Sequence, residues 1–195
     1  DVTPETFKQH PDACTRCPIG CRATQAVPGE GPLTAPLMVV GEQPGDAEDL
    51  SGRPFTGPAG QLFDACARDA GLPRAQTYVT NAVKPLKSTP RGKRRIHQRP
   101  DAGEVSHCKW WLDLERQWIK PRLILAMGAT AALSLTGTAK NITARQGTTE
   151  HAADGTPVLL TTHPSYFLRL PDARARAEAQ ARFTADLAAA ARLCA

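Results

Sequence analysis

The sequence predicts an α/β protein: a three-layer α/β/α sandwich around a central, mostly parallel sheet of four strands. Four apolar runs of strand length alternate with helical segments, and such strands connect through right-handed crossovers into a parallel sheet. The chain has 195 residues, 41% hydrophobic and 22% charged, as in an ordinary globular domain with a core. No internal repeat or linker interrupts it, so we expect one domain over residues 1–195.

The first strand and the loop after it are the centre of this prediction. Residues 37–40 (Leu-Met-Val-Val) have the length and β-branching of a buried strand, and a helical pattern runs from Gln61 to Gly71. The loop between them is rich in glycine, proline and acidic residues. Open α/β sheets hold their chemistry in loops at the carboxyl ends of strands, although most loops of this composition are simply turns.

The later elements continue the alternation of strands and helices. In chain order we expect a strand at 78–83, a long loop at 84–100, a helix at 101–118, a strand at 123–127, a helix at 128–135, a small hairpin within 141–155, a strand at 158–162 and a helix at 172–193. Asp101 has the position of a helix N-cap, and a loop as long as 84–100 is usually functional or disordered.

The net charge of +5 is concentrated in that long loop. Its basic residues, with no acid among them, are Lys84, Lys87, Arg91, Lys93, Arg94, Arg95 and Arg99. Such a run suits the neutralisation of nucleic-acid phosphates, and a solvated loop is the plainer alternative. Aromatic residues make up only 5% of the chain, which argues against a base-stacking platform for single strands.

No apolar run approaches the roughly 18 residues that cross a membrane, and residues 1–5 lack the features of a signal peptide. We therefore expect a cytoplasmic protein without a membrane partner. Nothing in the sequence indicates an obligate interface, so we expect a monomer.

The chain contains six cysteines, which in a cytosolic protein indicate metal binding or catalysis before disulfides. Cys14, Cys17 and Cys21 are close together, and Cys108 lies in the helix predicted at 101–118. Cys66 and Cys194 lie in alanine-rich helical contexts and are expected to be packing residues.

Polar side chains follow the predicted strands: Glu42 with Asp46, then Asn81, then His163. An Asn side chain can read the edge of a base, and a ring such as Phe55 can stack on that base. A histidine can stabilise negative charge on a departing base, and a carboxylate can position a nucleophile or stabilise a cationic sugar. Each also has a structural alternative, since strand-end Asn residues cap turns and a His before Pro is often structural.

Several separated motifs resemble those of the iron–sulfur uracil-DNA glycosylases of family 4. They are Glu42-Gln43-Pro44-Gly45, Gly52-Arg53-Pro54-Phe55, Asn81-Ala82-Val83-Lys84 and His163-Pro164-Ser165. The resemblance extends from Cys14 to Arg169. Gly-Glu-Gln-Pro-Gly and the insert Lys93-Arg94-Arg95-Ile96-His97 resemble UdgX, the branch that becomes covalently attached to its DNA.

The resemblance implies that uracil is flipped into a pocket and cleaved from its sugar, giving free uracil. Phe55 would stack on the base, Asn81 and Gln43 would contact it, and His163 would stabilise the uracil anion. In ordinary members water then attacks C1′ of the sugar. In UdgX-like proteins a loop histidine attacks instead, and His97 matches that position.

Glu42 would take the proton from this imidazole or hold its attacking tautomer, with Asp46 a second catalytic acid. Attack needs a neutral ring, which the basic residues around His97 favour. The residues expected to contact the DNA, single- or double-stranded, are Lys93, Arg94, Arg95, Leu168 and Arg169.

The resemblance also implies a [4Fe-4S] cluster, for which Cys14, Cys17 and Cys108 match three ligand positions. The fourth position, just after Lys84, is Pro85, which cannot bind iron. Cys21 could supply the missing thiolate, so we expect all four cysteines as ligands. An open or non-cysteine fourth site, or a structural zinc on the same thiolates, is the alternative.

We therefore expect a uracil-DNA glycosylase that bonds to the abasic sugar through His97. The alternatives are a conventional family 4 enzyme that turns over with water as nucleophile, a non-catalytic iron–sulfur DNA-binding protein and a zinc-stabilised binding module.

Overall fold

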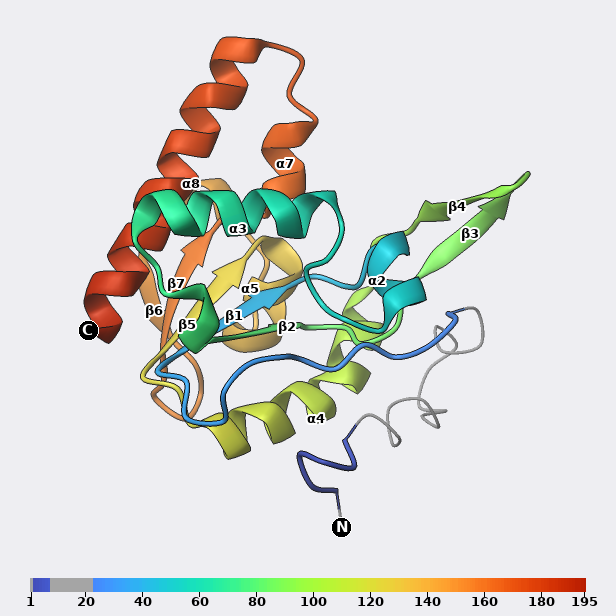
Figure 1. Ribbon diagram of the computed structural model, residues 1–195, viewed down its shortest axis with the longest axis horizontal. Coiled ribbons are helices and arrows are strands. Elements are labelled where there is room, and N and C mark those ends of the chain that lie inside the picture. Colours follow the sequence, from blue (N-terminus) through green and yellow to red (C-terminus); the bar gives the residue numbers. More distant parts are fainter. Residues whose placement is uncertain (1, 8–22) are drawn as a thin grey trace.

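The computed structural model describes residues 2–7 and 23–195 and confirms the three-layer α/β/α fold (Figure 1). The central sheet has five strands rather than four, in the order β2-β1-β5-β7-β6. The strands are β1 (Leu37–Gly41), β2 (Thr77–Asn81), β5 (Leu123–Met127), β6 (Thr149–His151) and β7 (Pro157–Thr161). The first two, β5 and β7 pair in parallel, and β6 pairs antiparallel with β7 at the edge. The hairpin predicted within 141–155 therefore supplies the extra strand.

Helices cover both faces of the sheet. The helical segments are α2 (Asp46–Ser51), α3 (Pro58–Ala70), η2 (Arg74–Gln76), α4 (Ala102–Ile119), α5 (Ala129–Thr136), α6 (Ile142–Arg145), α7 (Pro164–Leu168) and α8 (Ala173–Cys194). One layer contains α3, α7 and α8, and the other contains α4 and α5 (Figure 1). None of the helices in the described part of the chain has the length and apolar character needed to span a membrane.

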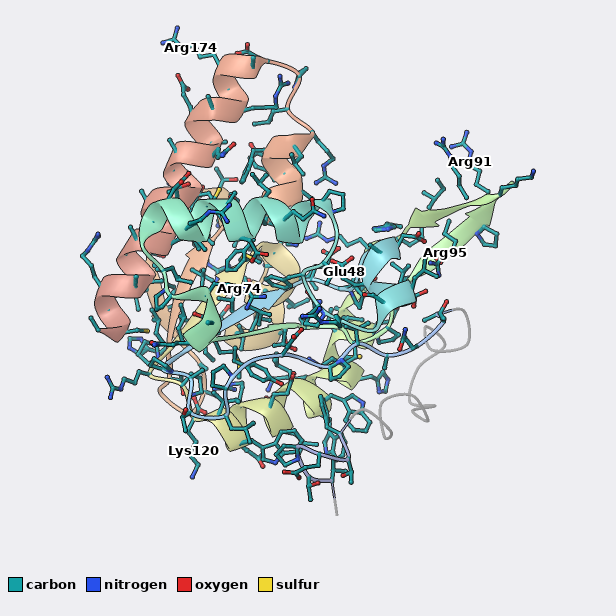
Figure 2. All side chains as sticks on the ribbon, viewed as in Figure 1. Glu48, Arg74, Arg91, Arg95, Lys120 and Arg174 are labelled. Atoms are coloured by element: carbon teal, nitrogen blue, oxygen red, sulfur yellow. The ribbon has the colours of Figure 1, made fainter. Side chains whose placement is uncertain are left out.

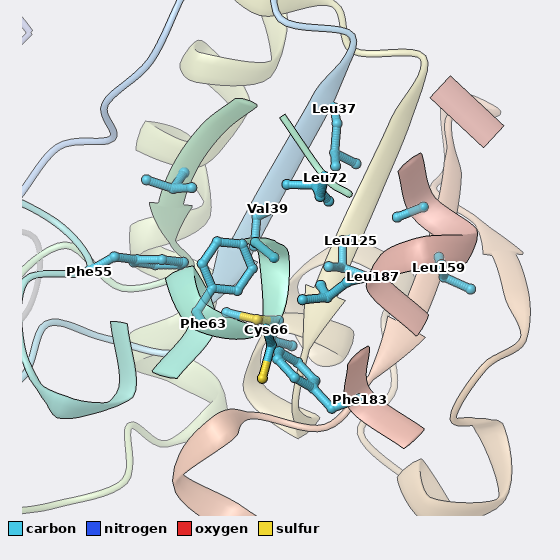
Figure 3. Packing of buried hydrophobic residues seen from close by; sticks show 14 of the residues in the cluster. Leu37, Val39, Phe55, Phe63, Cys66, Leu72, Leu125, Leu159, Phe183 and Leu187 are labelled. Carbon is cyan, nitrogen blue, oxygen red and sulfur yellow. The ribbon is translucent and has the colours of Figure 1, made fainter. Parts of the chain in front are cut away.

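Side-chain alternation along β1 divides the core between these two layers. Leu37 and Val39 pack with α3 and α8, as Figure 3 shows around Phe63, whereas Met38 and Val40 pack with α4 and α5. All of these side chains are buried because a parallel sheet is covered on both faces. By the same alternation, position 41 faces the layer of α3 and the next residue faces the layer of α5.

The basic segment is a β-hairpin and not the loop that the sequence predicted. Strand β3 (Ser88–Arg91) pairs antiparallel with β4 (Arg94–His97), and Gly92 turns the chain with a φ of 61°. Such a left-handed φ in a two-residue turn is where glycine is preferred. The hairpin extends away from the sheet as an arm (Figure 1).

Lys84 does not belong to the exposed basic surface, as the sequence had suggested. It is buried, and its ammonium forms an ion pair with the buried Glu115 of α4. The same ammonium donates to Thr80 Oγ1 at 2.6 Å and to the Asn81 carbonyl at 2.7 Å. Glu115 also accepts from Tyr78 at 2.5 Å, and burial together with this carboxylate raises the pKa of Tyr78 far above its ordinary value. The network fixes the carboxyl end of β2 to α4.

We predict that Glu115→Leu lowers the free energy of unfolding by roughly 3–5 kcal/mol, because it leaves the Lys84 charge buried without a partner. Urea denaturation followed by circular dichroism measures this loss. The matched control is Glu178→Ala, since Glu178 pairs with Arg174 on the exposed face of α8 and such a pair contributes under about 1 kcal/mol. Equal unfolding midpoints for the two variants would contradict the prediction.

Candidate active site

The predicted polar residues gather at the carboxyl edge of the sheet. Gly41 pairs in register with Asn81, so the ends of β1 and β2 are neighbours. Gly128 and His163 come just after β5 and β7, on the other side of β1. The edge therefore brings together segments that are far apart in the sequence, as parallel sheets do.

Asn81, His163 and Phe55 converge on one point beside Gly41. A Cβ atom on residue 41 would lie 2.6 Å from Asn81 Oδ1, 3.6 Å from His163 Nε2 and 3.7 Å from Phe55 Cε1. A side chain at position 41 would collide with the Asn81 amide, so only glycine leaves this space available. The three groups expected to hold a base thus face a common centre, which the sequence predicted as a set but could not place.

Phe55 is held in a strained backbone conformation. Its φ is 60°, which is rare for an aromatic residue, and its side chain is buried against Phe63 with ring centroids 5.3 Å apart (Figure 3). Gly60 makes this possible, because a Cβ there would lie 2.2 Å from the Phe55 carbonyl oxygen. Strain of this kind persists where the surrounding structure fixes a functional side chain.

The hydrogen bonds of His163 determine its tautomer. The Ser165 backbone N–H donates to His163 Nδ1 at 3.2 Å, and Ser165 Oγ lies 2.8 Å from the same nitrogen. Because Nδ1 accepts, the proton of the neutral ring is on Nε2, the nitrogen nearest Gly41. Burial lowers the pKa of His163, outweighing Glu42, which raises it, and Arg169 lowers it further. The ring therefore presents a neutral N–H donor to the space beside Gly41.

Glu42 turns toward the other layer. Its Oε2 accepts a hydrogen bond of 2.6 Å from Thr130 Oγ1 near the start of α5. The carboxylate therefore lies at the sheet edge, between the pocket on the α3 side and the α5 layer.

His97 reaches the acidic loop from the end of the hairpin. Its side chain is exposed, and its Cε1 lies 3.6 Å from where a Cβ of Gly45 would be. The loop that carries Glu42 is therefore also in contact with the predicted nucleophile.

Gln43 bonds to both ends of the hairpin rather than only facing the pocket. Its Oε1 accepts from the Lys87 backbone N–H at 2.8 Å, and its Nε2 donates to the Gln98 carbonyl at 3.0 Å. Both ends of this amide are thus occupied by backbone.

Arg95 and Asp46 form an ion pair with each other, although the sequence placed one in DNA binding and the other in catalysis. Arg95 Nε donates to Asp46 Oδ1 at 2.8 Å, and its guanidinium also pairs with the buried Asp49 (Figure 2). These carboxylates raise the pKa of Arg95, so it remains charged. The pair fastens the hairpin to α2.

The other predicted DNA contacts lie on two separate elements. Lys93 and Arg94 are exposed at the hairpin turn, close to Arg91 in Figure 2. Leu168 and Arg169 are exposed at the end of α7, with Leu168 49% accessible. The structure does not bring these two groups together in one patch.

Of the predicted cluster ligands, only Cys108 lies within the described residues; Cys14, Cys17 and Cys21 are outside them. Cys108 is buried in α4, in a cluster that also contains Phe7 and Trp111. Phe7, shortly before Cys14 in the sequence, thus anchors the chain beside the helix that carries Cys108, which fits a shared thiolate site. Residues 2–7 and 23–195 by themselves contain no group of three or more His, Cys, Asp or Glu side chains suited to a metal ion.

Sequence reasoning missed three contributors to this site: the empty position 41, Thr130 and the Lys84–Glu115 pair. Thr130 follows a glycine at the end of β5, and this position could have indicated it. Glu115 lies on the apolar face of α4, between Trp111 and Ile119, where a buried acid needs a partner.

We predict that His163 remains neutral below pH 6.5, with its proton on Nε2, because burial lowers its pKa. Nitrogen chemical shifts of the imidazole, followed against pH, measure both the tautomer and the midpoint. Since the unfolded chain takes up this proton first, His163 contributes a loss of stability as the pH falls from 6.5 toward the folded midpoint. The exposed His151 is the internal control with an ordinary midpoint. A His163 midpoint at or above that of His151 would contradict the prediction.

Comparison with known proteins places this site in a family. The protein-family profile of the uracil DNA glycosylase superfamily matches residues 28–188. The chain is 36% identical over 166 residues to a type-4 uracil-DNA glycosylase of Thermotoga maritima, covering 85% of this chain and 83% of that protein. It is 38% identical over 122 residues to a type-4 uracil-DNA glycosylase of Pyrobaculum aerophilum, covering 63% of this chain and 59% of that protein. A type-5 uracil-DNA glycosylase of the same organism is 32% identical over an alignment of 188 residues, covering 78% of each chain. The chain belongs to the uracil DNA glycosylase superfamily.

Proposed function

We propose that this protein removes uracil from DNA and that His97 then bonds to C1′ of the abasic sugar. The observation that supports excision most strongly is the convergence of Phe55, Asn81 and His163 on the space beside Gly41. A flat ring, a donor–acceptor amide and a neutral N–H donor are what a flipped uracil requires. The names of the related proteins agree with this activity.

In the proposed reaction the bond between N1 of uracil and C1′ breaks, and its electron pair leaves with the base. The Nε2–H group of His163 donates to the uracil oxygen on which negative charge develops. A neutral imidazole suits this role, because the bond strengthens as the charge forms and no proton has to be lost first. The sugar is left as an oxocarbenium-like cation at C1′, near the Glu42 carboxylate.

His97 is the proposed nucleophile for this cation. A lone pair on one ring nitrogen forms a bond to C1′, and the proton on the other nitrogen passes to Glu42 or to solvent. The position of the ring beside Gly45, on the loop that carries Glu42, supports this step. Asp46 contributes in this proposal through Arg95, which it holds against α2, and Gln43 contributes by aligning the hairpin with the loop. A direct contact between Gln43 and uracil stays a prediction.

The exposed cations Lys93 and Arg94 are proposed to contact DNA phosphates from the hairpin, with Leu168 and Arg169 contacting the strand near the flipped base. Arg95 contributes here by holding the hairpin in place. The separation of these two groups suits a DNA molecule that lies across the sheet edge.

A [4Fe-4S] cluster held by Cys14, Cys17, Cys21 and Cys108 is proposed to fix the N-terminal segment to α4. Thiolates are the ligands that such clusters prefer, and the cluster contributes to structure, not to cleavage. The packing of Phe7 in the cluster of side chains around Cys108 supports this assignment.

We predict that the protein releases uracil from a deoxyuridine oligonucleotide and that Asn81→Ala lowers the rate of release roughly 10²–10³-fold, since a group aimed at the leaving base is lost. Single-turnover release of labelled uracil measures it. Gln76→Ala, an exposed amide at the opposite end of β2, should retain the wild-type rate. Absence of release by the wild-type protein would refute the proposed excision.

We also predict a DNA–protein band that survives denaturing electrophoresis. His97→Ser should abolish this band and allow multiple turnover, because water then takes the sugar. His151→Ser, which removes an exposed histidine from β6, should leave the band unchanged. Release of free abasic DNA by the wild-type protein, without a band, would identify a conventional enzyme in which His97 only contacts phosphate.

For the cluster, we predict a brown protein with about four irons per chain and broad visible absorbance. Cys21→Ser should lower the iron content, whereas Cys194→Ser should not, since Cys194 lies at the end of α8 near the Pro36 carbonyl. A colourless protein that contains zinc would refute the cluster.

A further inference from the structure

A groove of about 550 Å³ lies beside the catalytic loop, on the layer opposite the uracil pocket. It runs between the start of α4 and the start of α5, and its lining includes Arg99, Ala102, Thr130, Leu133 and Lys140. We name it the Arg99–Lys140 groove after the two cations in its lining. Neither the motifs nor the pocket around Gly41 accounts for it.

The groove is continuous with the reacting centre. Thr130 lines it and donates to Glu42 at 2.6 Å, so its wall touches the carboxylate proposed to assist His97. Arg99 directly follows Gln98, whose carbonyl accepts from Gln43 of the same catalytic loop. The groove therefore begins where the sugar of the flipped nucleotide would lie.

The charge of the groove is positive. Arg99 and Lys140 are exposed, and among the described residues that line the groove there is no carboxylate. Neither side chain takes part in an ion pair within the part of the chain that the structure describes, in contrast to Arg95 and Lys87 of the hairpin. Apolar side chains such as Leu133 complete the lining, which suits the sugar part of a nucleic-acid backbone.

We propose that the Arg99–Lys140 groove binds the DNA backbone on one side of the uracil nucleotide, with each cation contacting a phosphate. This inference rests on the proposed function. Alternation along β1 places the uracil pocket on the α3 side of the sheet edge and Glu42 toward α5. A strand whose base enters the pocket and whose C1′ lies near Glu42 crosses the edge, and its next nucleotides then meet the groove.

The proposal is tested by binding with single-stranded probes that contain 2′-fluoro-2′-deoxyuridine, whose electron-withdrawing fluorine disfavours cleavage. One probe carries the analogue at its 5′ end and one at its 3′ end, so each extends in one direction only. The variant is Arg99→Gln/Lys140→Gln. The matched control is Lys120→Gln/Arg122→Gln, two exposed cations at the opposite end of the sheet. Lys120 is seen far from the hairpin in Figure 2.

We expect Arg99→Gln/Lys140→Gln to weaken binding of one probe about tenfold and to make its dependence of log K on log salt shallower by about 1.4, or about 0.7 for each lost phosphate contact on a single strand. The other probe should bind as it does to the wild-type protein. The control variant should match the wild-type protein on both probes.

Wild-type affinity and salt dependence of the Arg99→Gln/Lys140→Gln variant on both probes would overturn the proposal. Equal losses on both probes would also overturn it, because they would indicate a general field and not a site. Thermal unfolding midpoints establish that each variant is folded, and the single replacements Arg99→Gln and Lys140→Gln are measured in the same way if the double variant is not. Release of uracil by the wild-type protein, measured separately, distinguishes failure of this inference from failure of the proposed function.

Discussion

The absence of a side chain at position 41 is the constraint on which the site depends. Asn81 Oδ1 would lie 2.6 Å from a Cβ there, and the His163 and Phe55 rings lie about an ångström further away. The neighbouring elements are fixed accordingly: Lys84 and Glu115 hold the end of β2, Gly60 admits the strained Phe55, and Ser165 orients His163. A pocket of this kind is preorganised, since its polar groups are already aimed before a base arrives.

Electrostatics divide the molecule between its two layers. The pocket on the α3 side uses neutral groups, with the His163 pKa lowered by burial, and this suits the recognition of an uncharged base. The other side of the edge carries the charges: Glu42 at the sugar position, the cations of the hairpin and the groove beside α5. Several of the hairpin's basic residues are paired with acids, so the charges available for DNA are fewer than the sequence shows.

The sequence was sufficient to predict the layers, the four parallel strands and the edge at which Glu42, Asn81 and His163 meet, because apolar runs and strand-end residues carry that information. It did not predict β6, which is short and polar, or the hairpin, whose exposed strands have no apolar alternation. Lys84 was counted with the surface cations because its partner, Glu115, lies 31 residues away and only the fold brings them together. The position of His97 beside Gly45 is likewise a tertiary contact that no local pattern encodes.

The central claim, that the space beside Gly41 is the uracil pocket, is tested most directly by Gly41→Ala. The backbone at this position is an ordinary strand, so the added methyl group should act mainly on the pocket. The measurement is single-turnover uracil release, compared with the urea unfolding midpoint of the same protein. The account predicts a loss of at least about 100-fold in rate, comparable to removal of a catalytic donor, with a much smaller change in stability. Release at the wild-type rate by a folded Gly41→Ala protein would contradict it.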